Sequence, residues 1–84
     1  MMPALMYPIA TEKAINMIEK NNIITYVVDM RSTKKEIKEE FEKEFNVKVE
    51  RVSIIREPIN RKKAYIKLNP EYKASDIALK LKLI

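Results

Sequence analysis

The sequence lacks several residue types, and each absence narrows the chemistry open to it. It has no cysteine, which excludes disulfides and thiolate ligands. It has no histidine, which removes the commonest metal ligand and the usual general base near neutral pH. It has no glycine, so a glycine-rich phosphate-binding loop is excluded. Lysine, glutamate and tyrosine remain available, yet we expect no enzyme, no metal, no cofactor and no small-molecule substrate.

Long hydrophobic runs are also absent. No uninterrupted apolar stretch approaches the roughly 18 residues that a membrane-spanning helix needs. The first ten residues lack the basic flank and apolar core of a signal peptide. We therefore expect no membrane span and a cytoplasmic location. With 84 residues, 46% hydrophobic and 35% charged, the chain suits one folded domain over residues 1–84.

Charge is present in excess of one sign. The formal net charge is +5, and residues 46–84 carry ten basic against four acidic residues, a net of +6. Residues 1–30 carry a net of −1 and residues 31–45 are neutral. A basic second half suits a polyanionic partner such as RNA.

The first half predicts a helix and a central strand. Thr11 is the expected N-cap of a helix that ends near Asn21 and Asn22, after a possible short edge strand at residues 5–7. Residues 23–30 are rich in β-branched and aromatic side chains and predict a strand. Both faces of this strand are partly apolar, so helices are expected on both faces of the sheet.

The second half predicts a helix, a hairpin and a last helix. Ser32 or Thr33 caps a helix that runs to Phe45, with Asn46 closing it. Residues 47–56 predict a strand with a bulge near residues 50–51, residues 57–62 the connection, and residues 63–68 the returning strand. Ser75 is the expected cap of a final helix with a buried stripe of Ile77, Leu81 and Ile84. The predicted fold is α+β, a small sandwich with a mainly antiparallel sheet of three to four strands packed with helices.

The second helix has its charges placed against its own dipole. Its N-terminal end carries Lys34, Lys35 and Lys38, preceded by Arg31, where cations are unfavourable. Two interpretations are open: these cations meet an external anion such as RNA phosphate, or they form a solvated face with i,i+4 partners among the glutamates.

The hairpin connection concentrates basic residues. Four occur within eight positions, opposed only by Glu57; they are Arg56, Arg61, Lys62 and Lys63. This cluster either enters an RNA groove and neutralises phosphates, or keeps the hairpin soluble and discourages edge pairing.

Tyr65 lies between Lys63 and Lys67 on the outward side of the returning strand. The ring can stack on a base while the lysines hold phosphates, or it can pack on the lysine stems.

The ordered motifs along the chain resemble those of the large-subunit ribosomal protein L23 family, archaeal type. Five stretches carry the resemblance in consistent order over roughly residues 4 to 84: Pro8–Ala14, Asn22–Asp29, Lys35–Lys38 with Phe45–Val49, Lys62–Leu68 and Ala74–Ala78. The chain departs from the family where Pro58-Ile59-Asn60 and Lys82 stand at positions that often hold glycine. It also lacks the long basic hairpin of bacterial members.

The resemblance implies a structural constituent of the large ribosomal subunit. Such a protein binds large-subunit ribosomal RNA beside the peptide exit tunnel, neighbours a protein of the L29 family, and helps to dock signal recognition particle or nascent-chain chaperones. By position, Thr11 and Lys13 are expected near RNA and Glu12 at a docking site for these factors. Lys35 and Lys38 match helix positions near RNA, and Lys62, Lys63 and Tyr65 match the base of the RNA-binding hairpin. The alternative is a protein-interaction module that does not belong to the ribosome.

Overall fold

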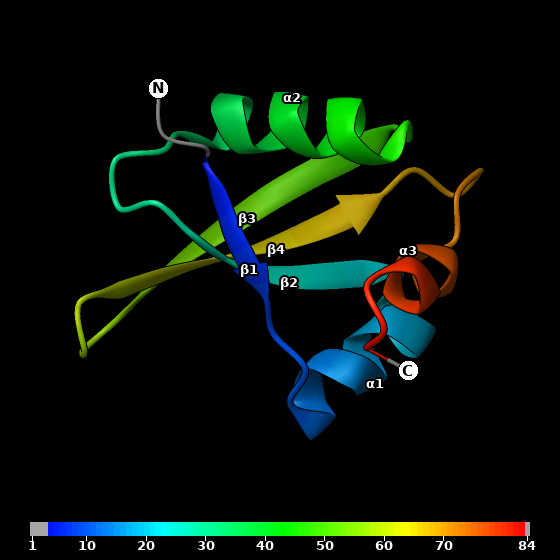
Figure 1. Cartoon of the computed structure of the whole chain (residues 1–84), viewed down its shortest axis with the longest axis horizontal. Coiled ribbons are helices and arrows are strands. Elements are labelled where there is room, and N and C mark those ends of the chain that lie inside the picture. Colours follow the sequence, from blue (N-terminus) through cyan, green and yellow to red (C-terminus); the bar gives the residue numbers. More distant parts are fainter. Residues whose placement is uncertain (1–3, 84) are drawn as a thin grey trace.

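The computed structural model describes residues 4–83. The elements follow in the order β1 (Leu5–Pro8), α1 (Glu12–Asn21), β2 (Ile23–Val28), α2 (Lys34–Phe45), β3 (Val49–Glu57), β4 (Arg61–Leu68) and α3 (Ala74–Lys80). Figure 1 shows α2 lying along one side of the sheet, with α1 and α3 near the opposite end from the β3–β4 hairpin. The predicted α+β class and the short first strand are confirmed.

Local side-chain hydrogen bonds set the start of the first two helices. The Thr11 hydroxyl accepts from the Ala14 amide at 3.2 Å, as the sequence predicts. Thr33, rather than Ser32, caps α2: its hydroxyl accepts from the Glu36 amide at 3.2 Å, and the Glu36 carboxylate accepts from the Thr33 amide at 2.9 Å. This reciprocal arrangement is a capping box.

The last helix begins earlier than predicted. It starts at Ala74 with Lys73 as its N-cap, and no side chain of its own caps it, so the prediction for Ser75 is wrong. The Ala74 amide instead donates to Oδ1 of Asn22 at 2.7 Å. A residue 52 positions away in the sequence therefore provides the capping interaction that local pattern assigned to a serine.

Asparagine and lysine take the positive φ angles that glycine usually supplies. The residues with positive φ are Asn22, Asn46, Asn60 and Lys82. Lys82 follows α3, where its amide donates to Leu79 and the Leu83 amide donates to Ala78, a Schellman arrangement in which glycine is preferred. Of the predicted apolar stripe, Ile77 is buried and Leu81 is partly buried, and Ile84 lies outside the described residues.

The four strands form one sheet in the order β1-β2-β4-β3, with every neighbouring pair antiparallel. The predicted bulge is confirmed, because the register of β3 shifts between Val49 and Arg51. Glu57 pairs with Arg61, so the hairpin connection spans only residues 58–60 and is shorter than predicted. A three-residue connection that ends in a left-handed residue, here Asn60, is a common hairpin geometry.

The hydrophobic core lies on one face of this sheet. Ile24 pairs with Ile66 and Tyr26 with Ala64, and these side chains join Ile18, Phe41 and Ile77 from the three helices, alongside other residues, in a single core. Within the described residues, no side chain of the second face belongs to this core. The expectation of helices on both faces is therefore wrong: the sheet has one hydrophobic core, on one face.

Two glutamates of α2 bond to strands at the margins of the sheet. Glu40 accepts from the amides of Ala4 and Leu5, both at 2.8 Å, and Glu42 accepts from the Val49 amide at 2.7 Å. The sequence pattern suggested only solvated partners for lysine at these positions. The bonds fasten β1 and the start of β3 to the helix that covers the core.

Candidate nucleic-acid interface

The second face of the sheet is basic. Antiparallel partners share a face, so the pairs Ser53–Tyr65, Ile55–Lys63 and Glu57–Arg61 place their side chains opposite the core. The pair Arg51–Lys67 lies on the same face. We call five residues of this face the basic sheet face: Arg51, Arg61, Lys63, Tyr65 and Lys67. Four of them were predicted as RNA contacts, and the fold brings them onto one surface.

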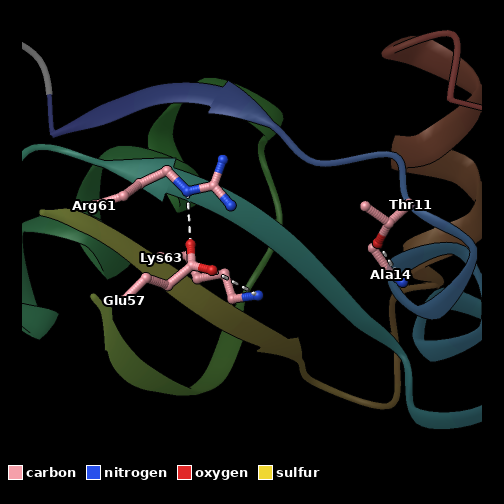
Figure 2. A network of polar contacts seen from close by, with 5 residues as sticks. All are labelled: Thr11, Ala14, Glu57, Arg61 and Lys63. Carbon is pink, nitrogen blue, oxygen red and sulfur yellow. Dashed lines mark hydrogen bonds and ion pairs between the residues drawn. The ribbon is translucent and has the colours of Figure 1, made fainter. Parts of the chain in front are cut away.

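Glu57 moderates the positive charge of this face. Its carboxylate accepts from Nε of Arg61 at 2.6 Å and lies 3.8 Å from Nζ of Lys63, as Figure 2 shows. The hydrogen bond from Arg61 is the main reason that the pKa of Glu57 is lowered. Because this contact uses Nε, the terminal N–H groups of the Arg61 guanidinium are not engaged by Glu57.

Tyr65 is half-buried between cations. Nζ of Lys63 lies 5.8 Å from the centroid of its ring, within cation–π range. Lys67 lies at the other side, with Nζ 4.0 Å from a carboxylate oxygen of Glu50. Both interpretations of this tyrosine therefore have a structural basis, since its ring contacts a lysine and still has partial solvent access.

Sequence reasoning missed Arg51. The bulge reverses the alternation of β3, so Arg51 pairs with Lys67 and joins the basic sheet face, where it is exposed. The signal was available, because a predicted bulge at residues 50–51 changes the face of every residue that follows.

The start of α2 carries a second group of cations. Arg31, Lys34, Lys35 and Lys38 are all exposed. Within residues 4–83, none of their amines or guanidinium groups lies within 4.0 Å of a carboxylate oxygen, so the predicted i,i+4 ion pairs of α2 are not formed at this distance. Glu36, Glu40 and Glu42 instead bond to backbone amides.

The hairpin cluster is divided between the two faces. Lys62 is buried, with only 7% of its surface exposed, and its amine donates to the carbonyl oxygens of Ser32 at 2.7 Å and Met30 at 3.4 Å. Arg56, its partner in β3, is exposed but lies on the core side of the sheet. The four predicted cations therefore do not converge: Arg61 and Lys63 point one way, Arg56 and Lys62 the other.

The start of α1 is a separate surface. Thr11, Glu12 and Lys13 are exposed there, and the Thr11 hydroxyl is occupied by its cap. Figure 2 shows Thr11 well apart from Arg61 and Lys63. The fold does not join these three residues to the hairpin.

A cleft of about 760 Å³ opens between β1, the β2–α2 loop and the hairpin. Its lining combines apolar side chains, cations and hydrogen-bonding groups, and includes Met6, Tyr7, Met30, Arg31, Asn60 and Arg61. Of the residues that line the cleft, only Arg31, Arg61 and Lys62 were predicted from the sequence as RNA contacts. Residues 4–83 contain no cluster of histidine, cysteine, aspartate or glutamate suited to a metal ion. In the same part of the chain, no helix has the length and apolarity to cross a membrane.

The sequence matches the model of a known protein family. The model of the family described as ribosomal protein L23 matches residues 4–80. The matched range includes every strand and helix described above.

Proposed function

Because the chain belongs to the L23 family of ribosomal proteins and is therefore a structural protein of the large ribosomal subunit, we propose that it binds large-subunit ribosomal RNA through two groups of cations. The first group is the start of α2, formed by Arg31, Lys34, Lys35 and Lys38. The second is the basic sheet face. The alternative of a module that does not belong to the ribosome is set aside, since the family match spans nearly the whole chain.

One observation carries the proposal. The four cations at the start of α2 are exposed and lack carboxylate partners within 4.0 Å among the described residues. Cations at a helix N-terminus oppose the helix dipole at a cost of some tenths of a kcal/mol each. A polyanion removes that cost, because phosphate is attracted both by the side chains and by the free amides of the first turn.

The proposal also includes a place on the ribosome. We place the protein in the cytoplasm, beside the peptide exit tunnel and next to a protein of the L29 family, on the strength of the motif resemblance. Glu12 is exposed at the start of α1 and directly follows Thr11, which Figure 2 shows well apart from Arg61 and Lys63. It is therefore free to contact signal recognition particle or a nascent-chain chaperone while the cations hold RNA.

Charge neutralisation at two matched places tests the RNA surface. Lys34, Lys35 and Lys38 are changed to glutamine in one variant, and Lys43, Lys48 and Lys80 in the control. All six are exposed, and each variant removes three charges from the net +5. Filter binding to large-subunit RNA is measured between low and physiological salt.

We expect the first variant to bind more weakly, with a log–log salt slope smaller by about two to three units, because each phosphate contact contributes about 0.7 to 0.9. The control variant should keep its slope nearly unchanged. Equal losses in the two variants would mean that only overall charge matters, and the proposed surface would then be wrong.

A further inference from the structure

The cleft beside the hairpin has the composition of a nucleotide site. Its apolar side is formed by Met6 and Tyr7, which are 56% and 48% exposed, together with Val27 and Met30. Proteins that recognise single-stranded RNA commonly stack an unpaired base on an exposed aromatic ring. Tyr7 is an aromatic residue in this position that no motif pointed out.

The walls of the cleft are fixed by internal hydrogen bonds. Asp29 accepts from the Arg31 amide at 2.8 Å, and the Asp29 carbonyl accepts from the Ser32 hydroxyl at 2.6 Å. The buried amine of Lys62 holds the Ser32 carbonyl from the hairpin side at 2.7 Å. A preformed site loses less conformational entropy on binding than a mobile one.

The cleft has two cationic side chains that a phosphate can reach. Its cations are Arg31, Arg61 and Lys62, against the carboxylates Asp29 and Glu36. Both carboxylates already accept hydrogen bonds from backbone amides, and Lys62 is buried. The charged groups that a ligand can approach are the Arg31 side chain and the terminal N–H groups of Arg61, next to Tyr7.

Tyr7 and Arg61 are close enough to act together. The Glu57 contact is the largest cause that raises the pKa of Arg61, and the Tyr7 side chain is the second. Tyr7 pairs with Val27 and Val27 with Lys63, so the ring lies on the basic sheet face beside Arg61. Asn60 adds a side-chain amide at the rim, with the donor and acceptor that a base edge requires.

From this arrangement we propose that the cleft binds one unpaired RNA base, stacked on Tyr7, with its flanking phosphates held by Arg31 and Arg61. The proposal rests on the proposed RNA-binding function and adds a single-stranded contact to it. The phosphate contacts supply salt-dependent affinity, whereas stacking supplies affinity that salt does not screen. A folded RNA with an extruded nucleotide is therefore preferred over a continuous duplex.

The test uses the full chain with a six-nucleotide adenosine RNA as the probe. Binding is followed by the backbone amide resonances of Met30, Arg31 and Asn60 and by anisotropy of a labelled probe. A hexamer of the same charge without bases serves as the reference ligand. Two variants are matched: Tyr7→Phe keeps the ring, and Tyr7→Leu replaces it with an aliphatic side chain.

We expect the adenosine hexamer to move the resonances of the cleft amides more strongly than the abasic hexamer. Tyr7→Leu should lower its affinity about five- to one-hundredfold with an unchanged salt slope, and Tyr7→Phe should bind as the wild type does. Equal binding of the two hexamers, or no effect of Tyr7→Leu, would overturn the inference. Large-subunit RNA binding measured on the same variants separates this failure from that of the proposed function, which depends on the α2 lysines and not on Tyr7.

Discussion

At the scale of single residues, the adjacent Lys62 and Lys63 lie in opposite environments, one buried and one on the surface. Lys62 and Lys63 are adjacent in a strand, so they point to opposite faces. Lys62 lies under the β2–α2 loop and bonds to two carbonyl oxygens, whereas Lys63 lies on the basic sheet face near Glu57. The same chemical group therefore serves internal structure at one position and an external surface at the next.

The difference predicts distinct effects of one substitution at the two positions. Lys62→Met should lower the free energy of unfolding by about 1.5 to 3 kcal/mol, because it leaves the carbonyl of the buried Ser32 without its charged donor. Lys63→Met should cost about 0 to 1 kcal/mol and instead reduce the salt slope of RNA binding by about 0.7 to 0.9. Urea unfolding and filter binding measure the two quantities. A stable Lys62→Met variant with a reduced slope would show that this amine contacts RNA after all.

Strand parity explains which site residues could be predicted. The outward positions predicted for Lys63, Tyr65 and Lys67 leave Ala64, Ile66 and Leu68 to point inward, and these three residues are buried. The same alternation, continued two residues back from Ala64, gives Lys62 an inward position. The predicted strand began at Lys63, however, and left Lys62 in the connection. The boundary of the hairpin depends on the left-handed angle of Asn60, which composition alone does not fix. The burial of Lys62 was therefore not predicted, because the hairpin connection was predicted to be longer than it is.

At the scale of elements, Asn22 joins parts of the fold that are distant in sequence. It ends α1 in a left-handed conformation. Its side chain donates to the carbonyl oxygens of Tyr72 at 2.8 Å and Leu68 at 3.4 Å, and accepts from the Ala74 amide at 2.7 Å. The end of one helix thereby fixes the end of β4 and the start of α3. Local patterns predicted the helix end but not these long-range contacts, because helix and turn propensities depend only on residues nearby in the sequence.

A comparison with Asn46 separates backbone conformation from side-chain contacts. Both asparagines end helices at positive φ, where glycine avoids a steric cost. Among the hydrogen bonds of the described residues, the side chain of Asn46 has none, unlike that of Asn22. Asn22→Gly should therefore destabilise the protein by about 2 to 4 kcal/mol, from two to three lost hydrogen bonds, and Asn46→Gly should be neutral or stabilising.

Urea unfolding measures both variants, and hydrogen exchange of the Ala74 amide reports the local effect. Faster exchange of Ala74 in the Asn22 variant alone is the expected result. If both variants lose the same stability, the contacts of Asn22 contribute nothing beyond the turn that it forms.

At the scale of the whole molecule, the sheet separates a core from a charged surface. The core face holds apolar side chains from all three helices, while the opposite face presents arginines, lysines and Tyr65. This two-sided arrangement follows from alternation in β4 and was predictable. That helices cover only one face was not predictable. Thr25 and Val27 make the second face of β2 partly apolar in the sequence, and both are buried in the structure as well.

The core also fixes how stability depends on alkaline pH. Tyr26 is 4% exposed and packs edge-on against Phe41, with ring centroids 6.0 Å apart. Burial, with a smaller effect of Glu44, raises the pKa of Tyr26 from 10.0 to about 12. Between these pH values the unfolded chain loses its phenol proton before the folded one does, so stability is complete below pH 10 and is lost as the pH rises towards 12.

The expected loss is about 2 to 3 kcal/mol over that range, because a pKa difference of one between the folded and unfolded states corresponds to about 1.4 kcal/mol. Tyr26→Phe removes the ionisable group and keeps the ring, whereas other titrating groups contribute equally to both proteins. The difference in free energy of unfolding between wild type and variant should therefore change by this amount between about pH 9 and pH 12, as measured by urea titration. A difference that stays constant with pH would show that the Tyr26 phenolate is solvated as well in the folded protein as in the unfolded chain, and that burial does not raise its pKa.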